Sequence, residues 1–102
     1  GGALTPKGTL QIDSGAEAAL RKGRSLLPAG VVAARGKFER GDLIAVESEA
    51  GQIIANGLSA YSLADTQIIL GHKSREIERL LGYRGRDELV HADDLVMLEN
   101  SN

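Results

Sequence analysis

The sequence predicts a mainly β fold, a small mixed β-barrel with α-helices inserted between its strands. Two observations lead to this prediction. Short apolar or alternating segments recur along the chain between turns rich in Gly, Pro and Asp, and three helix starts led by Ser are each followed by a Gly stop. Closing the strands into a barrel would remove exposed strand edges, and the helices would cover the barrel ends. The 102 residues fit one compact domain.

The first elements are a strand and a helix. Residues 9–12 alternate polar and apolar side chains, which predicts a half-buried strand. Ser14 is the expected helix cap, with Glu17 completing a capping box and Gly23 ending the helix. Residues 25–30 are apolar but contain Pro and Gly, so they predict a buried or ligand-facing loop rather than a regular element.

Three strands follow in the middle of the chain. Residues 31–34 form a strand of small side chains, and residues 43–46 form a mostly apolar one. The turn at residues 49–51 returns the chain, so residues 52–58 are expected to pair with the preceding strand as a hairpin. Gly57 within that strand predicts a bulge or a close approach of another segment.

Two helices come next. Ser62 is the expected start of one, with Asp65 at the capping-box position and Gly71 as the stop. Ser74 is the expected start of the other, which Gly82 ends.

The last apolar pieces, residues 88–91 and 95–98, predict two closing strands, and residues 99–102 are expected to fray. Apolar side chains within the predicted strands and the last helix supply the expected core. The candidates are Phe38, Leu43, Ile44, Val46, Ile53, Ile54, Leu80, Leu81 and Val96.

Composition excludes several classes of function. The chain has no Cys, which rules out disulfides and thiolate metal sites and fits a cytoplasmic location. The start lacks a signal-peptide pattern, and no apolar run approaches the roughly 20 residues of a membrane span, so no membrane partner is expected. The net charge of −2 and the three aromatic residues are unlike a dedicated nucleic-acid binder.

Eight short segments, in this order, resemble one protein family. They are residues 8–16 (GTLQIDSGA), 25–31 (SLLPAGV), 36–42 (GKFERGD), 55–58 (ANGL), 61–62 (YS), 71–77 (GHKSREI), 81–83 (LGY) and 91–96 (HADDLV). Together they are similar to the C-terminal PUA domain of bacterial glutamate 5-kinases. The resemblance implies a PUA-like pseudobarrel over residues 15–98, preceded by a linker and first strand in residues 1–14.

The resemblance also implies a parent enzyme. Glutamate 5-kinases transfer the γ-phosphate of ATP to the side-chain carboxylate of L-glutamate, the first step of proline biosynthesis. ATP and Mg²⁺ would bind in the kinase domain, which this chain lacks, so no catalytic, cofactor or metal site is expected here. The expected partners are that kinase domain and neighbouring subunits.

A candidate surface lies at the end of the first helix. Arg21, Lys22 and Arg24 cluster there, and Gly30 follows in the next loop. In PUA relatives that bind RNA, this helix and loop face the RNA, and the glycine lets a phosphate approach. The alternative is that the three cations only complement the helix macrodipole.

Two further clusters contain histidine. His72 and Lys73 precede the expected third helix, whose N-terminus would favour an anion such as a phosphate. They are equally consistent with solvated loop residues. Residues 91–94 (HADD) have the residue types of a metal or acid–base site, but they also fit a turn before the last strand.

Three hypotheses of function follow. The first is an accessory domain that tunes assembly or feedback in a metabolic kinase. The second is a module that binds RNA weakly. The third, an enzyme in its own right, lacks any phosphate-binding loop in the sequence.

Overall fold

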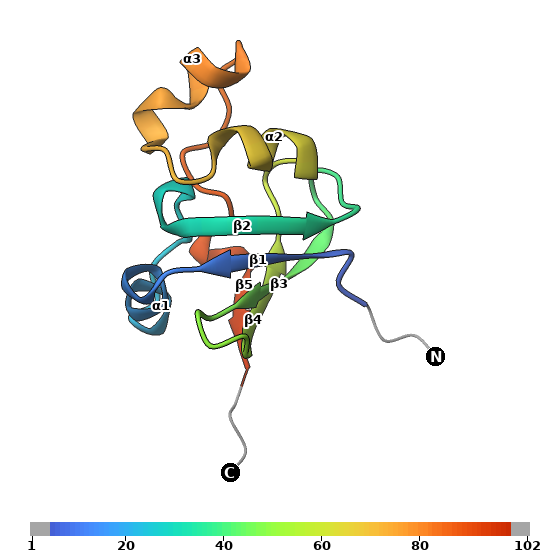
Figure 1. The fold of residues 1–102 in the computed structure, drawn as a ribbon, viewed down its shortest axis with the longest axis vertical. Helices are drawn as coiled ribbons and strands as arrows, with labels where there is room; N and C mark the ends of the chain where they lie inside the picture. Colours follow the sequence, from blue (N-terminus) through green and yellow to red (C-terminus); the bar gives the residue numbers. More distant parts are fainter. Residues whose placement is uncertain (1–4, 99–102) are drawn as a thin grey trace.

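The computed structural model describes residues 5–98. Five strands, three α-helices and three single 3₁₀ turns make up this part of the chain (Figure 1). The strands and helices are β1 (Gly8–Ile12), α1 (Ser14–Arg21), β2 (Val31–Gly36), β3 (Leu43–Glu47), β4 (Ile53–Leu58), α2 (Leu63–Ile69), α3 (Ile77–Leu81) and β5 (Leu95–Met97).

The strands form one mixed sheet in the order β2-β1-β3-β4-β5. Strand β1 pairs antiparallel with β2 and parallel with β3, while β3–β4 and β4–β5 are antiparallel pairs. The predicted mainly β fold with inserted helices is therefore confirmed, as is the β3–β4 hairpin. The sheet is open, with β2 and β5 at its edges, rather than closed into a ring.

The helices lie at two places around this sheet, at the edge formed by β2 and at the end of β1 (Figure 1). Figure 1 shows α1 at one end of β1, α2 running beside β2, and α3 stacked beyond α2. Buried side chains from the sheet, the helices and residues 89–90 form a single core. Its largest fully buried members are Phe38, Leu10, Ile12, Leu26, Ile44, Ile54, Ile69 and Leu89.

The predicted core is partly correct. Phe38, Ile44, Val46 and Ile54 are buried, Leu80 and Leu81 pack against the core, and Leu43 is half-buried. The prediction that Ile53 and Val96 belong to the core was wrong, because these residues are 38% and 65% exposed. Ile53 lies at the hairpin end, where the register shifts between Val46 and Glu47, and Val96 lies on the edge strand β5 opposite Asn56.

The helix starts differ in detail from the sequence prediction. Asp13, not Ser14, caps α1, because its Oδ1 accepts a hydrogen bond of 2.8 Å from the backbone N–H of Ala16. The prediction for α2 is confirmed, since Ser62 Oγ accepts from the N–H of Asp65. Ser74 begins a 3₁₀ turn and donates its hydroxyl to the carbonyl of Asp87, so it caps no helix.

The predicted strand at residues 88–91 was also wrong. Leu89 and Val90 are buried, but among the described residues this segment forms one isolated bridge, between Val90 and Leu26, and the carbonyl of Leu89 accepts a further hydrogen bond from the N–H of Ala60. The N–H of Leu26 donates to the carbonyl of Val90, and the N–H of Leu89 donates to the carbonyl of Leu26. Gly57 is closely approached by this segment, as predicted, because an added Cβ would lie 2.6 Å from Val90 Cγ1. The fraying expected at 99–102 falls outside the described residues.

Candidate functional site

A groove lies between α1 and the segment that follows it. Its volume is about 450 Å³, and we call it the α1 groove. Its lining consists of Asp13, Gly15, Ala16, Ala19, Arg24, Ser25, Leu27, Ala29, Gly30 and Glu88. Arg24 and Gly30, two of the predicted site residues, are thereby brought together.

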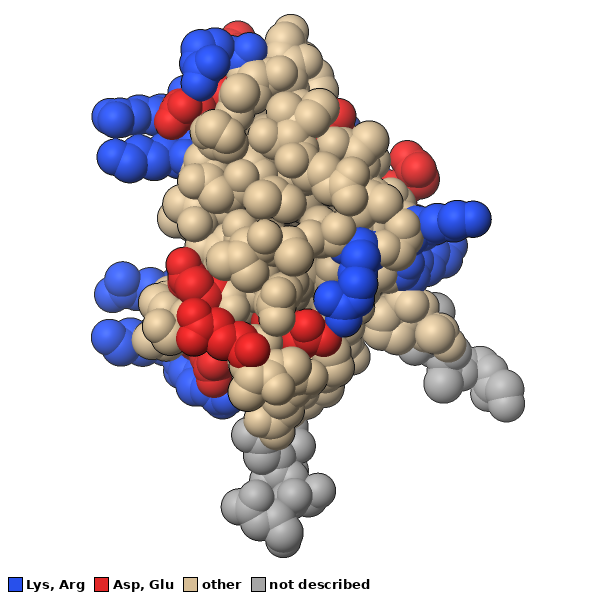
Figure 2. Space-filling model, in the orientation of Figure 1, with Lys and Arg blue, Asp and Glu red and all other residues tan. Residues whose placement is uncertain are grey.

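The three predicted cations of this region do not act as one basic patch. The guanidinium of Arg21 is paired with Glu17, at 2.9 Å from Nη2 and 3.1 Å from Nε to the same carboxylate oxygen. Arg21 and Lys22 are exposed outside the groove, and Arg24 alone of the three lines it. Figure 2 shows acidic and basic side chains side by side over α1. The field at this surface is therefore mixed in sign.

Gly30 has a packing reason to be glycine. A Cβ at this position would lie 2.6 Å from the Cβ of Ala16, so the 3₁₀ turn Pro28–Gly30 packs against α1 only without a side chain there. The carbonyl of Gly30 also accepts a hydrogen bond of 2.9 Å from the N–H of Asp13. Gly30 therefore fixes the shape of the groove wall.

The predicted residues His72 and Lys73 lie apart from the groove lining. His72 Nδ1 is 3.6 Å from Glu76 Oε1, and Lys73 is exposed at the start of the turn Ser74–Glu76. The 3₁₀ turn Ser74–Glu76 has three residues, and α3 begins only at Ile77 and has five. No long helix therefore directs its N-terminus at His72 and Lys73.

Residues 91–94 form a turn held by backbone hydrogen bonds. His91 Nδ1 accepts from the N–H of Asp93 at 3.1 Å, and the N–H of Ala92 donates to Ser25 Oγ at 2.8 Å. Within residues 5–98, no group of three or more His, Asp or Glu side chains is placed to hold a metal ion.

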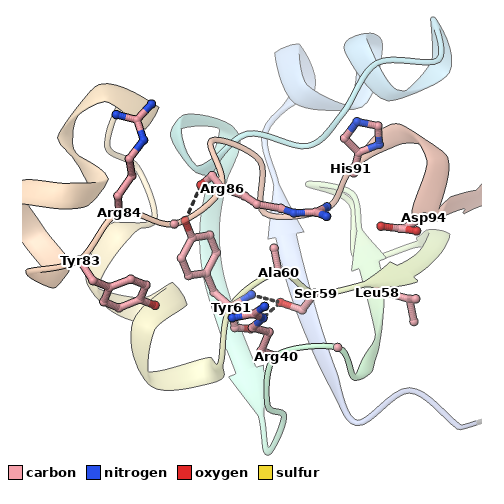
Figure 3. Close-up of a pocket in the computed structure, with 12 residues that line it drawn as sticks. Arg40, Leu58, Ser59, Ala60, Tyr61, Tyr83, Arg84, Arg86, His91 and Asp94 are labelled. Atoms are coloured by element: carbon pink, nitrogen blue, oxygen red, sulfur yellow. Dashed lines mark hydrogen bonds between the residues drawn. The ribbon is translucent and has the colours of Figure 1, made fainter.

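A second hollow contains residues that the sequence analysis did not single out as a site. We call it the arginine pocket; its volume is about 440 Å³. It is lined by Arg40, Gly41, Leu58, Ser59, Ala60, Tyr61, Tyr83, Arg84, Gly85, Arg86, His91 and Asp94 (Figure 3). Of its lining, the sequence analysis considered only His91 and Asp94 for a site, as part of the cluster at residues 91–94; the arginines are marked in the sequence by Arg-Gly at residues 40–41 and Arg-Gly-Arg at residues 84–86, within stretches of mixed charge.

Hydrogen bonds hold the walls of the arginine pocket. The buried Tyr61 donates its hydroxyl to the carbonyl of Arg86, and Ser59 Oγ donates to the carbonyl of Tyr61 at 2.6 Å. The N–H of Gly41 donates to the carbonyl of Ser59 at 2.7 Å. Burial is the main cause that raises the pKa of the Tyr61 phenol, so this hydroxyl stays a donor at neutral pH.

Tyr83, on the rim of the same pocket, is tied to α2. Its hydroxyl donates to Asp65 Oδ2 at 2.6 Å. This hydrogen bond to a carboxylate raises the pKa of Tyr83 to about 12. The loop that follows α3 is thus anchored at Tyr83 and again at Arg86.

No helix within residues 5–98 is both long enough and apolar enough to cross a membrane. The described part of the chain therefore contributes no membrane-spanning helix to the candidate surfaces above.

Comparison with known proteins gives consistent matches. The family model described as "PUA domain" matches residues 8–81. The glutamate 5-kinase of Paramagnetospirillum magneticum is 55% identical over 96 residues, which cover 94% of this chain and 26% of that protein. The glutamate 5-kinase of Allorhizobium ampelinum is 54% identical over 100 residues, covering 98% of this chain and 26% of that protein. The chain thus spans about a quarter of the length of the curated relatives it matches.

Solved structures share the fold. A PUA domain from Aeropyrum pernix K1, crystallised as a tartrate complex, matches with a TM-score of 0.60 and 27% identity, covering 86% of this chain and 49% of that one. A chain of the archaeal box H/ACA sRNP Nop10-Cbf5 complex matches with a TM-score of 0.56 and 25% identity, covering 82% of this chain and 24% of that one.

Proposed function

Because this chain belongs to the PUA domain family and is homologous to the C-terminal region of glutamate 5-kinases, we propose that it is the accessory domain of such a kinase. The parent enzyme would phosphorylate L-glutamate with ATP at the start of proline biosynthesis. ATP and Mg²⁺ would bind in the remainder of that enzyme. Its place of action would be the cytoplasm, in keeping with the lack of Cys.

One observation carries this proposal. The identity to glutamate 5-kinases is 51–55% over 94% of the chain or more in several relatives, and it is continuous rather than limited to one motif. The structural neighbours, at 25–27% identity, support the fold but do not single out a parent enzyme.

The α1 groove is the surface that we assign to docking on the kinase portion of the parent. Its floor is made of small and apolar side chains, with Leu27 47% exposed at the edge. Its rim carries two acidic side chains, Asp13 and Glu88, and one basic side chain, Arg24. Apolar surface with a polar rim is typical of a contact between domains.

RNA is the alternative partner, and two observations support it. Lys22 and Arg24 are exposed and have no ion pair within residues 5–98, and one structural neighbour comes from an sRNP complex. Two phosphate contacts would give a log–log salt slope of only about −2, with affinity at the weak end of the typical non-specific range, near 10⁻⁴ M. A titration with tRNA tests this alternative. Sub-micromolar binding at physiological salt that a Lys22→Ala/Arg24→Ala variant loses would make RNA the main partner.

The proposal is tested on the full-length parent enzyme and on the same enzyme without this domain. Glutamate-dependent ATP turnover should be kept by the truncated enzyme, because the proposal places the ATP site in the remainder of the parent enzyme. Its molecular mass in sedimentation or its inhibition by proline should change. Loss of all turnover by a truncated enzyme that is folded, or identical behaviour of both proteins in mass and inhibition, would contradict an accessory role.

A further inference from the structure

The arginine pocket gathers cations from segments that are far apart in the sequence. Arg40 comes from the turn between β2 and β3, while Arg84 and Arg86 come from the loop after α3. In Figure 3, the side chain of Arg86 reaches across the pocket toward His91, Arg40 lies beside Tyr61 and Ser59, and Arg84 points away from the others. Arg40 and Arg86 are therefore the two guanidinium groups that border the hollow.

Arg40 and Arg86 differ in their partners from the three arginines of the chain that form ion pairs. Arg21, Arg35 and Arg79 each pair with a glutamate, at 2.7–2.9 Å. Within residues 5–98, neither Arg40 nor Arg86 has an ion pair. The two guanidinium groups on this hollow therefore have charged N–H donors that no carboxylate of the described residues pairs with. An oxyanion bound in the hollow could accept hydrogen bonds from these donors.

The surrounding carboxylates belong mostly to other surfaces. Asp65 accepts the hydroxyl of Tyr83, Asp87 lines a separate hollow at residues 74–78, and Glu88 lines the α1 groove. Among the described residues that line the arginine pocket, Asp94 is the one carboxylate. Arg40 and Arg86 against Asp94 leave an excess of positive charge among the side chains that border the hollow (Figure 3), in a chain whose net charge is −2.

The walls are held in place before any ligand arrives. The hydroxyl of Tyr61 fixes the carbonyl of Arg86, and a Cβ on Gly85 would overlap the Tyr61 ring, so this loop lies directly on the buried tyrosine. Gly41 is fixed to Ser59 on the opposite side. Little ordering of the backbone would be needed on binding, which favours affinity in a small site.

We propose that the arginine pocket binds a small organic anion with more than one oxyanion group, held by forked hydrogen bonds from Arg40 and Arg86. Its volume of about 440 Å³ is that of a site for a small molecule. His91 accepts a hydrogen bond at Nδ1, which leaves Nε2 as the ring's donor at the same pocket. Carboxylates and phosphates share this oxyanion chemistry, and the experiment separates them. The inference does not depend on the parent enzyme.

The test is calorimetry of the 102-residue chain with two probes, pyrophosphate for phosphates and succinate for dicarboxylates, at low and physiological salt. At least one probe should bind saturably, and the tighter one identifies the chemical class. Arg40→Gln/Arg86→Gln should weaken binding by about tenfold or more for each arginine, because each loses a charge-assisted hydrogen bond. Arg86→Lys should give an intermediate loss, since it keeps the charge but not the fork.

The matched control is Lys37→Gln/Arg75→Gln, which removes the same amount of charge from exposed positions that do not line the arginine pocket. It should bind the probe as the unchanged chain does. Amide NMR spectra show whether each variant is folded, and in the unchanged chain the shifts on binding should centre on Gly41, Ser59 and Gly85. Absence of saturable binding by both probes, an equal loss in the control, or shifts centred on another surface would overturn the proposal.

Discussion

The hydroxyl of Tyr61 donates to the backbone carbonyl of Arg86, and this joins the end of β4 to the loop after α3. Tyr61 is buried, so its phenol supports the wall of the arginine pocket from the core. The position of a surface arginine thus depends on a core tyrosine.

Tyr61→Phe should lower the free energy of unfolding by about 1–3 kcal/mol, because the carbonyl of Arg86 loses its partner in a partly buried place. Tyr83→Phe is the matched control, since its hydroxyl bonds to an exposed carboxylate and the same atom is removed. Its cost should be below about 1 kcal/mol. Urea unfolding measures both, and equal costs for the two variants would contradict the role given to Tyr61.

The hydrogen bond between Tyr83 and Asp65 predicts a pH effect. The pKa of Tyr83 is about 12 in the folded chain, raised from about 10 by the bond to the carboxylate. Because the folded pKa lies above the unfolded one, the stabilisation is fully present below about pH 10 and is lost as pH rises toward 12.

Absorbance of the phenolate in a Tyr61→Phe background reports Tyr83 alone, since the chain has only two tyrosines. Asp65→Asn should then move the midpoint downward, toward that of free tyrosine. A midpoint that does not move would show that Asp65 is not the cause.

The cap of α1 gives a prediction that separates two neighbouring residues. Asp13→Ala should cost about 0.5–2 kcal/mol of stability, since it removes the acceptor for the N–H of Ala16. Ser14→Ala should cost less than about 0.5 kcal/mol, because Ser14 is exposed within the helix. Chemical denaturation of both variants measures the difference, and the reverse order would restore Ser14 as the cap.

Phe38 is the only Phe of the chain and lies in the core, against Gly8 of β1. Phe38→Ala should cost about 3–5 kcal/mol, because it removes a buried ring and leaves a cavity. This is a large share of the stability of a domain of this size. A cost below about 1 kcal/mol in urea unfolding would be incompatible with the described packing.

The sequence predicted most elements because their signals were local. Hydrophobic alternation located the strands, Ser62 and Gly71 bounded α2, and Gly82 ended α3 with a positive φ. The cap of α1 was misplaced by one residue because Asp13 and Ser14 are both good caps, and only the backbone decides between them. The predictions failed where tertiary pairing decides the outcome.

Such pairing explains the strand predicted at residues 88–91, which is apolar like a strand but forms only an isolated bridge to Leu26 among the described residues. It also explains Val96, which is apolar but lies on an edge strand that no helix covers. The candidate site residues also differ in whether they are close in the sequence or are brought together only by the fold. Arg24 and Gly30 are close in sequence and share the α1 groove, whereas Arg40 and Arg86 meet only through the fold.

Leu27→Glu in the full-length parent kinase tests whether this accessory domain docks through the α1 groove. Leu27 is 47% exposed at that groove, and Ile68→Glu is the matched control because Ile68 is equally exposed on α2 and does not line the groove. Sedimentation and proline inhibition are measured for both variants beside the enzyme without this domain. We predict that Leu27→Glu reproduces the change caused by removing the domain, because it places a charge in the apolar part of the contact. We predict that Ile68→Glu behaves as the unchanged enzyme. A Leu27→Glu enzyme that is indistinguishable from the unchanged one, while the truncated enzyme differs, would contradict the claim.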